Sequence, residues 1–384
     1  MKLINCLILC GILSTNMVVN ASDIKFSGFA TIAGGLTFDD DETLYGYDDS
    51  FSLGPDSLFG LQVSSEINDK WGATAQILSR GNEDWDTKFA WAYVSYQATD
   101  DVRFLFGRQR IPFYMYSDFL DVSYTYHWIT GVNSVYALPI DEFDGLGMTY
   151  NSEIGEFDST LNLFYGRNTG DMNIGGIIAK NSDVKDLFGA ALTLNRDWLT
   201  LRAGYTRAEN TIPISDFEPL INGWRLADFN SVADDIELKD DEMVFLDFAV
   251  IVDYEKYLFV LEIINLDDDD KTFFAQQDAY YVSFGYKIRN DMLLHFTHSK
   301  TKEENSLDLL SSVPAGLDPG LDALIGGTVG LLTAINKENE ADTLGLRWDY
   351  DDSIALKAEI TLFSDKLNPA LDATLVRFAI STVF

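Results

Sequence analysis

The residues that could carry catalytic or metal chemistry are few and scattered in this chain. Its only histidines are His127, His295 and His298, and none has a carboxylate or cysteine partner at the spacing of a metal site. Neither a nucleophile elbow nor a phosphate-binding glycine loop is present, since Gly326-Gly327 lies in an apolar stretch with no lysine after it. We therefore predict that the chain is not an enzyme and that it needs no cofactor or metal.

Carboxylates are abundant, and their distribution excludes one class of partner. The chain has 61 Asp and Glu against 27 Lys and Arg, for a net charge of −34, and this field repels nucleic acid. Two acidic runs, 39–42 and 267–270, lack the alternating oxygen ligands of a calcium loop. They are interpreted as solvated loop tips.

Several cations occur inside apolar stretches, always on the opposite parity. The last stretch, LDATLVRFAISTVF, shows the pattern: Val376, Phe378, Ile380 and Phe384 share one parity, and Arg377, Ala379 and Ser381 share the other. A period of two is typical of a strand with one apolar face. The same reasoning applies to Arg103, Arg202, Arg347 and Lys357, and Glu262 is also placed on the non-apolar face.

The elements that must position these residues are about sixteen strands. They are predicted at 23–38, 57–67, 71–80, from 89, from 102, and at 146–151, 158–167, 187–195, 198–207, 243–254, 257–266, 279–288, 292–301, 344–350, 354–363 and 371–384. In the fourth strand, Phe89, Trp91 and Tyr93 are predicted to face outward. Links between strands alternate short and long, the longest being 210–241 and 302–341.

These features predict an all-β fold, a transmembrane antiparallel up-and-down β-barrel. Single-chain outer-membrane barrels have an even number of strands, short periplasmic turns and long outer loops. Both termini then lie in the periplasm, where the first and last strands pair. A cation facing lipid at mid-membrane costs about 2–4 kcal/mol, so the cations listed above should face the lumen. A large soluble all-β protein is the alternative.

The start of the chain has the features of a secretory signal peptide at residues 1–21. Lys2 precedes an apolar run, and Val19-Asn20-Ala21 supplies compact residues for cleavage after Ala21. Cys10 offers a lipoprotein alternative. Cys6 and Cys10 are the only cysteines, so the barrel of residues 22–384 has no disulfide. No later run of 18 apolar residues is present to form a membrane-spanning helix.

The link after the fifth strand is unusually aromatic for a solvated loop. Between Arg108 and Asp144 it contains Tyr114, Tyr116, Tyr124, Tyr126, His127, Trp128 and Tyr136. We predict that it folds into the lumen, which is wide enough in a barrel of this size to admit a loop. The alternative is that the aromatics cover the rim or a subunit contact.

At this point the chain resembles the general diffusion porins of Gram-negative outer membranes. The resemblance rests on strand count, loop order, the terminal Phe384 and Phe143-Asp144-Gly145-Leu146 entering the sixth strand. The segment from Gly107 to Tyr114, with Ser117-Asp118 and Trp128, is similar to porins of marine γ-proteobacteria. The resemblance implies a homotrimer whose third outer loop narrows the pore.

In that family, acidic groups of the loop face a basic cluster on the wall. The resemblance then places Asp118 and Asp121, with Tyr114 and Tyr116, on the loop side of the constriction. The wall side comprises Arg103, Arg108, Arg110, Arg202, Arg347, Lys357 and Arg377, with Glu262 opposing them. This loop has few acidic residues at its tip, a departure from the family pattern.

The function expected is passive diffusion of small hydrophilic solutes and ions through a pore in outer-membrane lipid and lipopolysaccharide. A preference for cations is expected from the net charge, whereas the basic wall would favour anions. The alternatives are a channel specific for a sugar or small organic acid, an outer-membrane enzyme, and a barrel with a blocked lumen. Finally, Leu321, Leu324, Ile325, Val329 and Leu332 have helical spacing, which predicts a short helix over the mouth or against a neighbouring subunit.

Overall fold

The computed structural model describes residues 24–384, apart from 39–41, 175 and 269–275. The predicted signal peptide lies outside this part of the chain. So do residues 39–41 of the first acidic run and residues 269–270 of the second.

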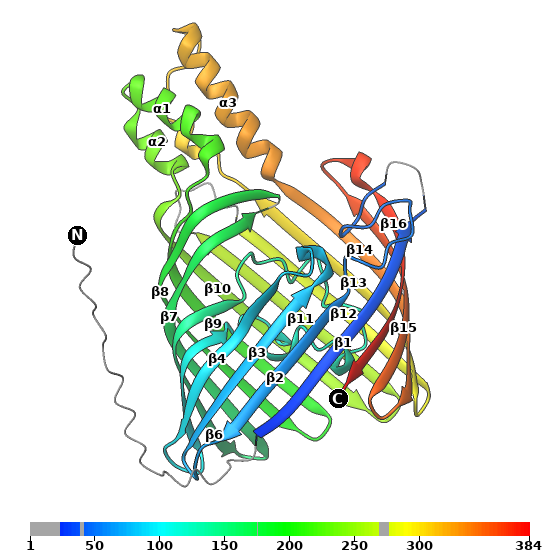
Figure 1. Ribbon diagram of the computed structural model, residues 1–384. Coiled ribbons are helices and arrows are strands. Elements are labelled where there is room, and N and C mark those ends of the chain that lie inside the picture. Colours follow the sequence, from blue (N-terminus) through cyan, green and yellow to red (C-terminus); the bar gives the residue numbers. More distant parts are fainter. Residues whose placement is uncertain (1–23, 39–41, 175, 269–275) are drawn as a thin grey trace, which may run out of the picture.

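Sixteen antiparallel strands form one closed barrel in which each strand pairs with its neighbours in sequence (Figure 1). This confirms the predicted fold. The strands are β1 Ile24–Thr37, β2 Leu58–Glu66, β3 Trp71–Arg80, β4 Thr87–Gln97, β5 Val102–Arg110, β6 Glu142–Ile154, β7 Phe157–Ile174, β8 Ile177–Arg196, β9 Leu199–Thr211, β10 Lys239–Tyr254, β11 Tyr257–Asp268, β12 Gln276–Arg289, β13 Met292–Glu304, β14 Lys337–Asp351, β15 Ile354–Asp365 and β16 Ala373–Val383.

The last strand closes the barrel on the first. Strand β16 pairs with β1 from Phe29 opposite Val383 to Thr37 opposite Leu375. The backbone N–H of Phe384 donates to the carbonyl of Gly28 at 2.9 Å, so the pairing continues to the last residue. Closure leaves no unpaired edge, which is what a sheet needs in lipid.

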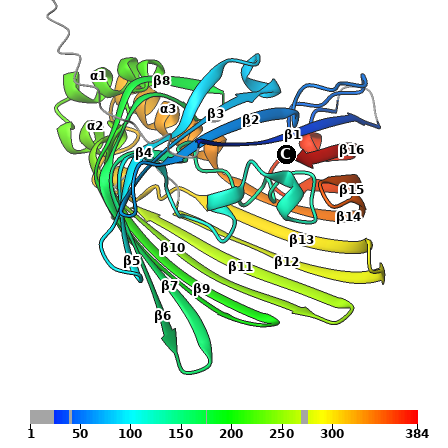
Figure 2. The ribbon, with the colours of Figure 1, turned by 60° about the horizontal axis from the view of Figure 1, so that its bottom comes forward.

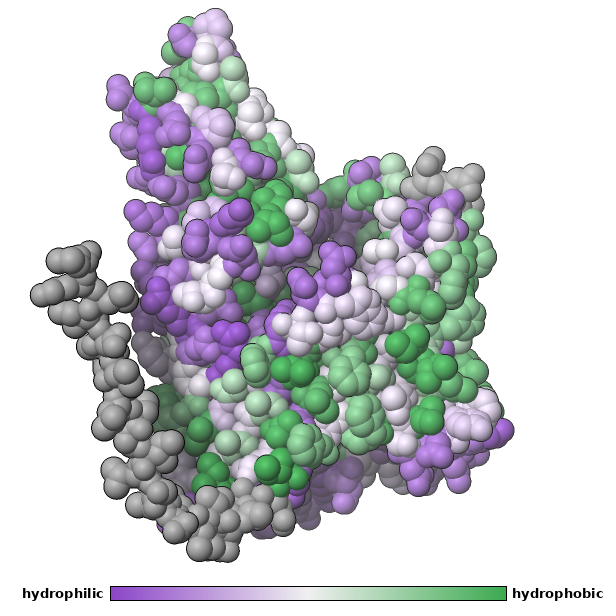
Figure 3. All heavy atoms as spheres, viewed as in Figure 1, coloured by the Kyte–Doolittle hydropathy of each residue, from purple (hydrophilic) through white to green (hydrophobic). Residues whose placement is uncertain are grey.

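The outer face of the barrel is apolar. Its exposed side chains include Phe26, Ile32, Phe59, Phe106, Leu146, Phe188, Phe248, Phe284, Leu344, Phe378 and Ile380. Figure 3 shows such residues gathered over the lower half of the barrel, with hydrophilic residues above and at the lower rim. Aromatic pairs stand where strands meet the short turns, as in Trp198–Tyr254 and Tyr257–Tyr286. Such a girdle is typical of a membrane interface.

The two ends of the barrel differ in their connections. Short turns such as 255–256 join the strands at one end, and the start of β1 and the C-terminus lie toward that end (Figure 1). The long connections and the extended β7–β8 hairpin occupy the other end. There, helices α1 Glu218–Leu226, α2 Asn230–Ile236 and α3 Pro319–Ile335 form a tower above the barrel (Figure 1). None of the helices in the described residues is long and apolar enough to cross a membrane.

Helix α3 confirms the helix predicted from the spacing of leucines in this connection. The indole N–H of Trp224 on α1 donates to the Thr328 hydroxyl on α3 at 2.8 Å, so the two long connections hold each other. Helices α1 and α2 were not predicted from the sequence, because they are short and their apolar residues are interrupted by polar ones.

Strands β7 and β8 extend well beyond their predicted ends. Their pairing continues from Gly166 opposite Leu187 up to Ile174 opposite Ile177. This upper part lacks regular apolar alternation, since it has no lipid-facing side, although Met172, Ala179 and Val184 are buried in the apolar core. The alternation of apolar and polar residues therefore predicted only the lower part of the hairpin.

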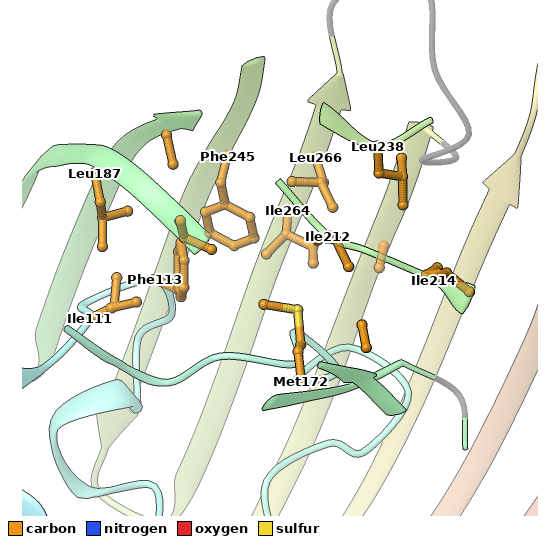
Figure 4. Close-up of a cluster of buried hydrophobic side chains, with 14 of the residues drawn as sticks. Ile111, Phe113, Met172, Leu187, Ile212, Ile214, Leu238, Phe245, Ile264 and Leu266 are labelled. Atoms are coloured by element: carbon orange, nitrogen blue, oxygen red, sulfur yellow. The ribbon is translucent and has the colours of Figure 1, made fainter. Parts of the chain in front are cut away.

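An apolar core fills part of the upper lumen. Figure 4 shows Ile111 and Phe113 of the loop after β5 close to Phe245 of β10, with Ile212 and Ile214 of the connection after β9 nearby. This core joins the inward-folded loop to the bases of the long connections.

Candidate functional site

Residues 111–141, between β5 and β6, form a loop inside the barrel, and we call this segment the inward loop (Figure 2). It contains two short 3₁₀ helices, Ser117–Phe119 and Ser123–Thr125, and otherwise has no regular structure. Its backbone groups therefore need hydrogen-bond partners from the wall, because unpaired polar groups are costly to bury.

Buried wall carboxylates accept hydrogen bonds from the backbone of the inward loop. The Glu262 carboxylate of β11 accepts from the Met115 N–H at 2.7 Å. The Glu359 carboxylate of β15 accepts from the Ile129 N–H at 2.8 Å. Both side chains point inward, as parity predicts for Glu262, and both are almost fully buried.

Wall cations bind the carbonyl oxygens of the same loop. The Lys357 ammonium donates to the Tyr126 carbonyl at 2.9 Å and to the Ser123 hydroxyl at 3.0 Å. Arg347 donates to the same Tyr126 carbonyl at 2.6 Å. Arg202 donates a hydrogen bond to the Pro112 carbonyl and forms an ion pair with Asp247 at 2.9 Å.

Arg377 completes this set on β16. It pairs with Asp56 at 3.0 Å and with Glu359 at 2.8 Å, and it donates to the Thr130 hydroxyl at 3.2 Å. The four cations of β9, β14, β15 and β16 thus face inward, as parity predicts. They contact the inward loop or its neighbours directly and do not face it across an open passage.

Hydroxyl groups of β12 and β13 bind the loop between these charged contacts. The Trp128 indole donates to the Thr297 hydroxyl at 2.8 Å, and the hydroxyls of Ser134 and Ser299 lie 2.9 Å apart. His127 lies 2.9 Å from the Ser283 hydroxyl. The loop is therefore packed along the β9–β16 side of the barrel.

The remaining predicted wall residues lie elsewhere. Arg108 is on the outer face, where it pairs with Asp144 at 2.8 Å, so its side chain does not line the lumen. Arg103 points into the lumen near the short-turn end and donates to Ser95 at 2.9 Å. Arg110 is buried against the inward loop, where it pairs with Asp121 and with Asp141.

The residues predicted on the loop side of the constriction also lie in different surroundings. Asp121 is buried between Arg110 and Arg80, whose guanidinium lies 2.8 Å from its carboxylate. Tyr114 and Tyr116 are buried in the apolar core and present no open ring face to a solute. Asp118 is exposed, and it lines an open cavity.

That cavity, of about 270 Å³, lies between the inward loop and strands β4–β7. Its lining includes Trp91, Tyr93, Leu105, Gln109, Asn162 and Phe164 from the wall, with Pro112 and Asp118 from the loop. The wall here is aromatic and amide-bearing. The structure thus brings Asp118 together with Trp91 and Tyr93. Asp121, Arg110, Arg202, Arg347, Lys357 and Arg377 lie in buried or half-buried contacts, whereas Arg108 lies on the outer face and Arg103 is exposed near the short-turn end.

Trp91 and Tyr93 correct the sequence prediction, which placed them outward. The register between β3 and β4 shifts between Gln76 and Ile77, opposite Trp91 and Phe89. This bulge adds one residue to β4, so the positions after it change face. Phe89 remains outside at 54% exposure, whereas Trp91 and Tyr93 turn into the lumen.

Strand β5 has a glycine with an unusual backbone conformation beside the bulge of β4. Gly107, opposite Tyr93, has a φ of +128°, and a Cβ there would lie 2.3 Å from the Ala92 carbonyl oxygen. Only glycine fits this position without strain. No local sequence signal marked the bulge itself.

Comparisons with known proteins agree with this architecture. No protein-family model and no curated protein sequence matches the chain. Among solved structures, the outer membrane channel DcaP of Acinetobacter baumannii aligns with a TM-score of 0.60 at 11% identity, over 94% of this chain and 97% of that one.

Two further structures are similar over nearly their full lengths. The anion-selective porin of Comamonas acidovorans gives a TM-score of 0.58 at 12% identity, covering 94% of this chain and 100% of that one. OmpT, an outer membrane protein of Vibrio cholerae in trimer form, gives 0.55 at 13% identity, covering 95% and 100%. The chain has the porin fold. At this level of identity the likeness concerns architecture, and the use of the lumen must be argued from its own residues.

Proposed function

We propose that the chain is an outer-membrane channel for passive diffusion of small hydrophilic solutes and ions, with no chemical step. The observation that carries this proposal is a closed barrel with an apolar outer band and a cavity in its lumen beside the inward loop. Pore width and lining charge set selectivity in such a channel.

The proposed placement puts the short turns and both termini in the periplasm and the helical tower outside, beside lipopolysaccharide. Cleavage after Ala21 would release the barrel of residues 22–384. A homotrimer is proposed on the resemblance to general porins, and the trimer form of Vibrio cholerae OmpT supports it.

The channel is proposed to prefer cations. Four predicted wall cations are bound to the inward loop or to carboxylates, whereas Asp118 is exposed in the open cavity. The net charge of −34 acts in the same direction by concentrating cations at the mouth.

Single-channel current in a planar bilayer under a KCl gradient tests the proposal. Stepwise conductance in threes, with a reversal potential of the sign for cations, is the expected result. Folded protein that conducts nothing would overturn the proposal and favour a barrel with a blocked lumen.

A further inference from the structure

The cavity beside Asp118 has a lining that the passage of inorganic ions does not require. Trp91 and Tyr93 have ring centroids 6.3 Å apart at an interplanar angle of 44°, and both residues line the same cavity. Leu105 and Phe164 add apolar surface, and Gln109 and Asn162 add amides. Pockets that bind small molecules combine such apolar walls with a few placed polar groups.

The uncompensated charge of this cavity is negative. Asp118 has no ion-pair partner among the residues that the structure describes. Arg110 also borders the cavity, but its guanidinium is engaged by Asp121 and Asp141. A second cavity, of about 290 Å³, contains Asp56, Arg80 and Asp121, each already in an ion pair.

Aromatic faces and a free carboxylate favour the same kind of solute. The face of an aromatic ring attracts a cation, and the attraction is strongest for tryptophan. The Trp91 indole nitrogen is buried without a hydrogen-bond partner in the described residues, so this ring is positioned by packing. The polar amides beside it can accept N–H groups.

We propose that this cavity binds small amphipathic organic cations, meaning ammonium compounds that carry an aromatic or branched aliphatic group. The ammonium lies between Asp118 and the rings of Trp91 and Tyr93, and the apolar group packs on Leu105 and Phe164. The inference rests on the proposed channel function and adds a solute class to it. A neutral sugar could also stack on the rings, but it would leave the carboxylate without a countercharge.

The test measures block of the KCl current by phenethylammonium, with phenylacetate, 2-phenylethanol and glucose as probes of matched size. Only phenethylammonium should reduce the current in a saturable manner. Asp118→Asn and Trp91→Leu should each raise its half-blocking concentration about two- to fivefold, as expected for one ion pair or one cation–π contact. Trp91→Phe, which keeps a ring, should lie close to the unaltered protein.

Asp100→Asn is the matched control, because it removes the same charge from the turn between β4 and β5, outside the cavity. Its half-blocking concentration should not change. Equal block by 2-phenylethanol, block by glucose alone, or a normal KCl current with no block would overturn the inference and leave the channel intact. Absence of KCl current from protein with the heat-dependent gel migration of a folded barrel would instead overturn the proposed function.

Discussion

Lys357 shows how the lumen uses a charged residue. Its ammonium is buried and bonds two groups of the inward loop, at Ser123 and Tyr126. A cation in this position satisfies carbonyl oxygens that no regular structure satisfies. Lys357 therefore holds the inward loop against the barrel wall.

Replacing this lysine should loosen the inward loop. Lys357→Met removes the donor and leaves carbonyls unpaired, at a cost of about 1–3 kcal/mol for each such buried group. We expect larger fluctuations of the open-channel current and a lower temperature of barrel unfolding. Lys366→Met is the control, since Lys366 is half-exposed and pairs with Glu340 on the surface. Equal effects of the two variants would contradict the assigned role.

His127 predicts a response to acid. Burial lowers the pKa of His127 well below its usual value, and the nearby His295, Lys357 and Arg347 add to the effect. In the unfolded chain His127 binds a proton below about pH 6.5, whereas burial in the docked loop disfavours this protonation. The docked position of the inward loop is therefore most stable above about pH 6.5 and loses stability as the pH falls below that value.

Current recordings from neutral to acidic pH should show new closures that begin below about pH 6.5. His127→Asn, which cannot be protonated, should remove most of them. His298→Gln is the control, because His298 pairs with Asp342 away from the inward loop. Closures that persist unchanged in His127→Asn would refute this role of the histidine.

At the scale of elements, the inward loop is packed as a fixed layer against β9–β16. The contact between Ser134 of the loop and Ser299 of β13 allows a direct test, as their hydroxyls lie 2.9 Å apart. A disulfide fits side chains at this separation. The barrel offers a clean background, since both natural cysteines are in the predicted signal peptide.

Ser134→Cys with Ser299→Cys should form a disulfide on oxidation without changing the mean conductance. The reason is that the bond holds the loop where it already lies. Conductance is compared before and after reduction, with each single cysteine variant as control. A large rise in conductance on reduction would show that the open channel requires a displaced loop.

Helix α3 carries a local prediction. The Asp318 carboxylate accepts from the N–H groups of Gly320 and Leu321, at 2.8 and 3.0 Å, and thus caps the helix. Asp318→Ala should destabilise α3 by about 0.5–2 kcal/mol, the usual cost of a lost N-cap. Faster proteolysis between residues 307 and 335 with unchanged barrel unfolding is the expected result. Asp308→Ala, in the same connection but outside the cap, is the control.

At the scale of the whole molecule, the net charge of −34 governs the approach of ions. Screening shortens the reach of this field from about 10 Å at 0.1 M salt to about 3 Å at 1 M. Cation preference, measured as reversal potential, should therefore be strong in dilute KCl and weaker in concentrated KCl. Asp118→Asn should reduce the cation preference that remains at high salt. A preference for anions in dilute salt would contradict the proposal.

The sequence by itself determined the barrel, its closure and the face of most strand residues. Alternation of apolar and polar residues is a local property, and in lipid it fixes which side faces out. For this reason Phe378 and Arg377 were placed correctly, and Phe384 was correctly predicted to end the closing strand. The loop after β5 was found because its aromatics are incompatible with a solvated position.

Only the tertiary structure decided what each inward residue faces. Parity places Arg202, Lys357 and Arg377 in the lumen but does not distinguish a partner across a passage from a loop in contact. A single bulge opposite Gln76 then reversed the face of Trp91 and Tyr93. Both outcomes depend on how distant segments pack against one another, and the spacing of residues along one strand does not record that packing.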